Sequence, residues 1–66
     1  MADRFALIGR KQEVRRRLEV LHRQLDHERN KAQPTQHRIN QLERQVEQLM
    51  AEEATLRVAI DQAGRA

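Results

Sequence analysis

The sequence predicts an all-α fold, an antiparallel two-helix hairpin packed as a coiled coil, and two patterns carry this prediction. Large apolar residues recur at intervals of three, four and seven residues in both halves of the chain. One proline, Pro34, lies almost at its midpoint. We expect a single domain, residues 1–66, with a helix at about 3–30, a turn at about 31–35 and a helix at about 36–63.

A single heptad register fits both predicted helices. The a positions begin at Arg4 and recur every seven residues as far as Ile60, and each d position follows three residues later. This spacing is typical of helices that bury one narrow stripe against another helix. The apolar members of the stripe are Leu7, Val14, Leu18, Leu21, Leu25, Ile39, Leu42, Val46, Leu49, Leu56 and Ile60.

Polar residues on this seam distinguish parallel from antiparallel packing. In a parallel dimer Lys11, Glu28 and Glu53 would each lie against their own copies, which places like charges together. If the chain folds back so that residue i faces residue 67 minus i, every a position meets a d position. Lys11 and Glu53 then lie in adjacent layers, where their charges can meet over the seam. We interpret Lys11, Glu28 and Glu53 as residues that set helix orientation.

Charged residues beside the seam favour the same antiparallel orientation. Folding the chain back brings Arg17 near Glu52 and His22 near Glu43. Opposite charges at these e and g positions help to select the orientation of paired helices.

Pro34 distinguishes a hairpin from an antiparallel dimer of two long helices. Proline inside a helix removes a hydrogen bond and clashes with the preceding turn, at a cost of about 3 kcal/mol. The sequence therefore predicts a turn, after which Thr35 caps the second helix or Pro34 begins it. A domain-swapped dimer of long helices is the alternative.

A single hairpin of this length is expected to need a partner, because small chains bury a small fraction of their surface. Phe5 and Ile8 lie off the seam on one flank of the first helix, and Met50 and Ala54 lie on the same flank of the second. Two hairpins meeting there would form a four-helix bundle, and a foreign helix would form a three-helix one. We predict contacts of this kind, with a second copy or another protein, for Phe5, Leu7, Ile8, Met50, Ala54 and Ile60.

Arginines on the first helix suggest an alternative partner, a nucleic acid or an acidic protein. The candidate contacts are Arg10, Arg16, Arg17 and Arg23, which share one outer flank. Glu13 precedes Arg17 by four residues, a pairing that ordinary solvated helices use, and no aromatic residue lies among the arginines to stack on bases. A solvated charged face is therefore the favoured interpretation of these arginines.

The predicted shape, a helical hairpin of some 60 residues that pairs into a bundle, resembles that of Rop, the plasmid copy-control RNA-binding protein. The resemblance concerns shape alone, because no run of residues matches and the small alanine layers of Rop-like packing are absent. It implies an alternative function, a homodimeric regulator that binds RNA or DNA through the basic face of the first helix.

The sequence offers no support for catalysis or for a metal or other cofactor. It contains no cysteine, and His22, His27 and His37 do not have the spacing of metal ligands. No nucleophile lies beside a base, and the longest apolar run is four residues, too short to span a membrane. We therefore expect a cytoplasmic, non-enzymatic interaction module, such as an adaptor, a chaperone or a small subunit, with no small-molecule substrate.

Overall fold

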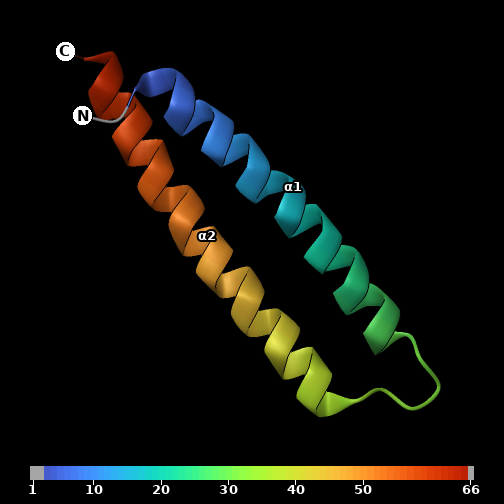
Figure 1. Ribbon diagram of the computed structural model, residues 1–66. Helices are drawn as coiled ribbons and strands as arrows, with labels where there is room; N and C mark the ends of the chain where they lie inside the picture. The colour runs from blue at the N-terminus through green and yellow to red at the C-terminus, as the bar shows by residue number, and fades with distance from the viewer. Residues whose placement is uncertain (1–2, 66) are drawn as a thin grey trace.

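Two long helices joined by a short turn form the whole of the described structure, residues 3–65 of a computed structural model. Helix α1 spans Arg4–Arg29 and helix α2 spans Gln36–Gly64. The two helices pack antiparallel, as Figure 1 shows, and form a rod of 53 × 14 × 13 Å. The predicted all-α hairpin is confirmed. Within residues 3–65, neither helix combines the length and apolarity needed to cross a membrane.

The helix ends follow from local chemistry. Asp3 caps α1, because its side-chain oxygen accepts a hydrogen bond from the Phe5 N–H at 3.4 Å. At the other end the Asn30 N–H donates to the Asp26 carbonyl at 3.0 Å, and the chain then leaves the helix. Thr35 takes the N-cap position of α2 with an extended backbone, but its side chain makes no capping hydrogen bond. Pro34 lies just before this position, where its missing N–H costs no helical hydrogen bond.

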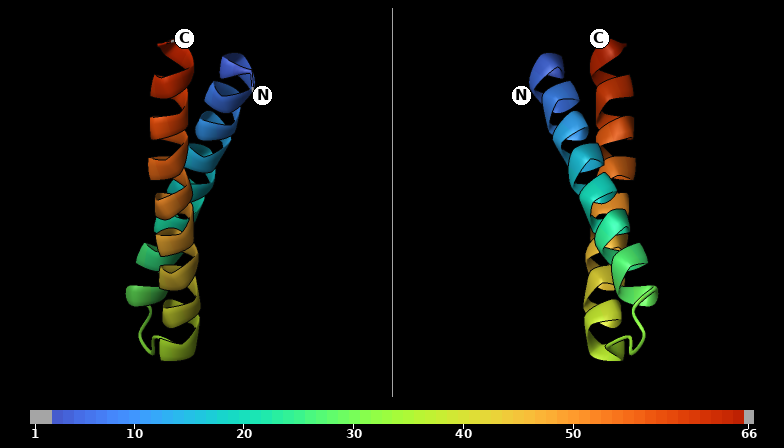
Figure 2. Two further views of the ribbon diagram at one scale, coloured as in Figure 1. Left: turned by 90° about the vertical axis from the view of Figure 1, so that its left-hand side faces the viewer. Right: turned by 90° about the vertical axis from the view of Figure 1, so that its right-hand side faces the viewer.

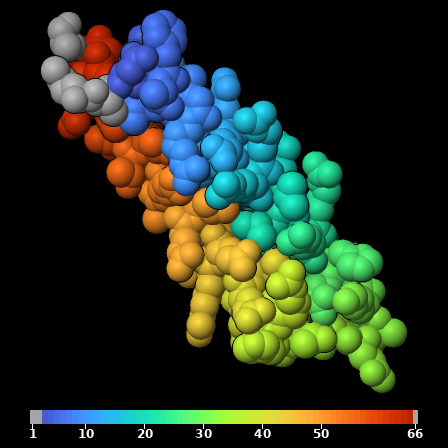
Figure 3. Space-filling model, in the orientation of Figure 1, coloured from blue at the N-terminus to red at the C-terminus, as the bar shows by residue number. Residues whose placement is uncertain are grey.

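The core is one layer of side chains along the seam between the helices. One cluster near the turn contains Leu21, Leu25, Ile39 and Leu42. A second cluster, toward the open end, contains Val14, Leu18 and Leu56. Val46 and Leu49 pack against both clusters but are only half-buried. The side views in Figure 2 show the helices crossing at an angle, and the space-filling view in Figure 3 shows a narrow rod with side chains projecting from it.

The open end of the hairpin is joined by a contact between the first residue of α1 and the last residue of α2. A Cβ atom on Gly64 would lie 3.3 Å from Cζ of Arg4. The guanidinium of Arg4 therefore lies against the C-terminus of α2, which has no basic residue in its own last turn. A cation is favourable there, because the helix dipole makes that end partly negative.

Candidate functional site

The four off-seam apolar residues predicted to form a contact surface are placed as follows. Phe5 is 81% exposed and Met50 is 56% exposed. Ile8 is half-buried and Ala54 is exposed. We call these four residues the open-end surface. Of the two seam residues grouped with them, Leu7 and Ile60, both are half-buried and neither is fully covered by the opposite helix.

Glu28 is the one charged residue among those the structure shows as buried, and it lies at the turn. Its carboxylate accepts a hydrogen bond from the Thr35 N–H at 3.0 Å and pairs with the Lys31 ammonium at 2.9 Å. The hydrogen bond from Lys31, followed by that from the Thr35 backbone, lowers the pKa of Glu28 below its ordinary value. Glu28 thus joins the end of α1 to the start of α2, across the turn.

The predicted meeting of Lys11 with Glu53 is not what the structure shows. Glu53 instead pairs with Arg57, one turn further along its own helix, at 3.4 Å. Lys11 is half-buried and makes no ion pair within residues 3–65. The correction has a simple cause: a partner at i+4 on the same helix is already within reach, whereas meeting across the seam requires both side chains to bend over the core.

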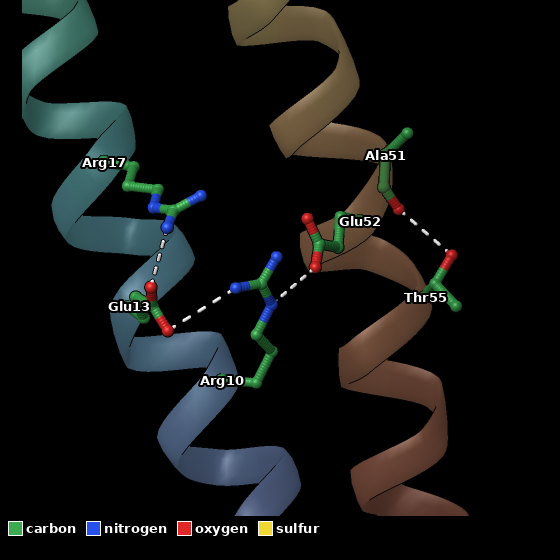
Figure 4. Close-up of polar contacts among 6 residues, drawn as sticks. All are labelled: Arg10, Glu13, Arg17, Ala51, Glu52 and Thr55. Atoms are coloured by element: carbon green, nitrogen blue, oxygen red, sulfur yellow. Dashed lines mark hydrogen bonds and ion pairs between the residues drawn. The ribbon is translucent and has the colours of Figure 1, made fainter.

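A network of four charged side chains connects the helices toward the open end (Figure 4). Arg10 of α1 donates from Nε to Glu52 of α2 at 2.7 Å and lies 3.4 Å from Glu13. Glu13 also accepts from Arg17 at 2.9 Å. The hydrogen bond to Glu52 raises the pKa of Arg10 further, so its charge is fixed. The network is partly exposed, and we assign it to holding the helix register rather than to a large stabilisation.

The expected pairs across the flanks involve the right glutamates but the wrong partners. Glu52 pairs with Arg10 instead of Arg17, and Glu43 pairs with Arg29 at 3.0 Å instead of with His22. In both cases the observed partner lies one heptad from the expected one. Each of these glutamates lies between two candidate partners on the opposite helix that are seven residues apart. The heptad pattern alone therefore does not decide which of the two candidates forms the ion pair. For Glu43 the observed partner is Arg29, whose planar, always charged guanidinium matches the geometry of a carboxylate.

The four arginines of the predicted basic flank divide into two pairs. Arg10 and Arg17 belong to the ion network just described. Arg16 and Arg23 are exposed, and among the described residues neither has an ion-pair partner. Arg16 lines a groove of about 600 Å³ in the middle of the rod, together with Val20, Leu21 and Leu49.

Two smaller depressions in the half of the rod nearest the turn have opposite charge. The first, of about 370 Å³, is lined by Arg23, His27, Glu28, Lys31 and Arg38 beside Gln24 and Leu42, and we call it the basic depression. The second, of about 380 Å³, is lined by His22, Asp26, Arg29, Glu43 and Glu47 beside Leu25 and Val46, and we call it the acidic depression.

Sequence reasoning missed both depressions, because it paired individual charges across the helices without adding up the charge on each side of the seam. The heptad register can identify them, because it shows which charged residues of the two helices share a side of the seam. It places Arg38 of α2 on the same side of the seam as Lys31, and Glu47 on the same side as Asp26.

Over the described range, no group of three or more His, Asp or Glu residues is placed to hold a metal ion. Comparison with models of protein families, with curated proteins and with solved structures found no match.

Proposed function

We propose that this hairpin is a non-enzymatic protein-interaction module that binds through its open-end surface. The partner is a second copy, which would complete a four-helix bundle, or a helical protein for which the hairpin serves as adaptor, chaperone or small subunit. The observation that carries the proposal is the exposure of Phe5, at 81%, beside seam residues that their own hairpin leaves half-buried.

The size of the exposed surface supports association. The chain has an accessible surface of 5351 Å², whereas a compact monomer of 7.8 kDa is expected to have about 4,400 Å². The difference, roughly 1,000 Å², is similar to the ~800 Å² that each partner buries in a standard protein interface. The excess arises because an elongated rod of 53 × 14 × 13 Å exposes more surface than a compact particle of the same mass.

The chemistry of the open-end surface favours a helix as the occupant. Phe5 and Ile8 are three residues apart on α1, and Met50 and Ala54 are four apart on α2. Both spacings place each pair on one face of its helix. An incoming helix that lies over these two faces would cover Leu7 and Ile60 as well, and would bury the apolar ring of Phe5.

The test compares matched surface substitutions. A double variant, Phe5→Gln with Met50→Gln, is expected to reduce the solution mass measured by light scattering, and to reduce helicity on dilution. Val58→Gln is the control, because Val58 is 57% exposed, almost the same as Met50, but lies outside the open-end surface. Unchanged mass and helicity in the double variant, or an equal loss in the control, would contradict the proposal.

Nucleic-acid binding by α1 is the second candidate function, and the unpaired state of Arg16 and Arg23 within residues 3–65 favours it. Titration with RNA and with DNA at several salt concentrations tests it. Binding to phosphates weakens with added salt, and the slope becomes shallower as each contacting arginine is removed. Binding that does not weaken with added salt, or that is unchanged when Arg16 and Arg23 are both removed, counts against this function.

A further inference from the structure

We propose that the hairpins associate face to face, with the acidic depression of one copy docked on the basic depression of the next. The inference rests on the proposed function, because it takes a second copy as the partner and names the two surfaces that meet. It goes further by predicting that the two surfaces differ, so that association does not close at a dimer.

The charges of the two depressions are complementary. The basic depression has three cations and one carboxylate, a net charge of +2 with His27 neutral. The acidic depression has three carboxylates and one cation, a net charge of −2 with His22 neutral. Surfaces with opposite potential attract each other and repel copies of themselves, which fixes which surfaces meet.

The excess charge in each depression belongs to residues that have no ion-pair partner among residues 3–65. In the basic depression Lys31 pairs with Glu28, which leaves Arg23 and Arg38. In the acidic depression Arg29 pairs with Glu43, which leaves two carboxylates. The four remaining side chains, all exposed and all without an ion pair among the described residues, are Arg23, Arg38, Asp26 and Glu47.

The depressions lie on opposite sides of the seam. In the heptad register Asp26 and Glu47 are b residues, on the side of the e flank. Arg38 is a g residue, and His27 of the basic depression is a c residue, both on the side of the g flank. Since e and g flank a coiled-coil seam from opposite sides, one copy presents one depression on each face.

Apolar side chains contribute little to this contact. Leu25 in the acidic depression is 5% exposed and Leu42 in the basic one is 1% exposed, whereas Val46 of the acidic depression is half-buried. Both depressions lie in the turn half, so two copies overlap along their full length when their turns point the same way. The open-end surface, which lies on the e and b side, then faces the side of its neighbour that carries the central groove with Val20.

The arrangement leaves one acidic and one basic face free at the ends of every open stack. Because each copy can bind one neighbour on each face, copies add one after another. They form a closed ring if the rotation between copies allows it, and otherwise an open row. The solution mass is therefore expected to exceed that of a dimer as concentration rises, and to fall as salt screens the charges.

A pair of charge-reversal variants tests the inference. Arg23→Glu with Arg38→Glu makes both faces acidic, and Asp26→Lys with Glu47→Lys makes both faces basic. Each variant alone is expected to self-associate at least roughly tenfold more weakly than the original chain, measured by sedimentation equilibrium, because like charges then face each other. An equimolar mixture is expected to recover association, since acidic and basic faces alternate again.

Controls separate this inference from the proposed function. Arg38→Glu is compared with Arg44→Glu, the same change at an exposed position of α2 outside the three depressions, and circular dichroism checks that helicity is retained. If the charge variants keep the original mass but Phe5→Gln with Met50→Gln loses it, the inference fails and the proposed function stands. The inference is also wrong if the equimolar mixture of the two charge variants does not associate. It is wrong as well if the charge variants lose binding to RNA or DNA while their solution mass is unchanged.

Discussion

The two ends of the hairpin are built from the same heptad but are completed to different degrees. At the turn, Leu25, Ile39 and Leu42 are at most 6% exposed, and Glu28 links the helices through two further contacts. At the open end, Leu7 and Ile60 in the same register are only half-buried. The seam layers beside the turn are buried, and the layer of Leu7 and Ile60 at the open end is partly exposed.

The difference has a geometric cause. Near the turn the connection joins the helices covalently, and the buried carboxylate of Glu28 accepts a hydrogen bond from the Thr35 N–H. At the open end the crossing helices are joined by the Arg4 contact with Gly64 and have no covalent link. Leu7 and Ile60 form the outermost large apolar layer of the seam, with another such layer on one side only, so they remain partly exposed.

The strongest test of this contrast removes the same side chain from each end. Leu42→Ala is expected to lower the free energy of unfolding by about 2–5 kcal/mol, since Leu42 is 1% exposed and its removal leaves a cavity. Leu7→Ala is expected to cost roughly 1–2 kcal/mol at low protein concentration, because less area is buried there. Thermal unfolding followed by circular dichroism measures both.

Measuring both variants at several protein concentrations provides a second test of the difference between the two ends. If association covers the open end, the loss caused by Leu7→Ala grows with protein concentration, whereas the loss caused by Leu42→Ala gains no such extra cost. Equal losses at every concentration would show that the two ends do not differ in the way described.

Acid is expected to weaken the turn through Glu28, by an intermediate amount. The folded state lowers the pKa of Glu28, so its stabilisation is complete above the ordinary glutamate pKa of about 4.3 and disappears as pH falls through the lowered value. Glu28→Gln is expected to remove this part of the acid dependence, seen in unfolding temperatures measured between about pH 7 and pH 2. Glu19→Gln, an exposed residue without an ion pair in the described range, is the control. An acid dependence that is the same in both variants would rule out the role of Glu28.

The smallest expected effect is a gain at the open end. Gly9 lies inside α1 with a negative φ, and a Cβ atom there would meet nothing within 4 Å. Gly9→Ala is therefore expected to raise the free energy of unfolding by about 0.5–1 kcal/mol, because alanine loses less backbone entropy in a helix. No gain in the unfolding temperature would show that the first turns of α1 are held by something other than helix propensity.

The hairpin was predictable because its strongest determinants are periodic. The apolar heptad specifies two helices, the like-charge layers of Lys11 and Glu53 disfavour the parallel form, and Pro34 specifies the turn. These features act through backbone geometry and through which face is buried, both of which can be inferred from spacing alone.

The polar contacts were less predictable, because spacing leaves each flanking charge a choice of partners. Glu52 lies between Arg10 and Arg17, and only the side-chain conformations decide that Arg10 binds it while Arg17 binds Glu13. Glu28 was expected to act on the seam, and its additional hydrogen bond to the Thr35 N–H depends on the path of the turn. The open-end surface and its partner stay predictions, since heptad spacing identifies apolar residues off the seam but not the chain that would cover them.

The contact between Arg4 and Gly64 has a mechanical consequence. Because the helices begin and end side by side there, a force that pulls the two chain ends apart loads the seam one layer at a time, like a zipper, rather than shearing all layers together. The half-buried layers at that end would separate first, and the well-packed leucines near the turn last. A force along the rod axis, applied to α1 at one end of the rod and to α2 at the other, would instead be shared by all layers of the seam. The hairpin therefore resists this force better than a force that separates the two chain ends.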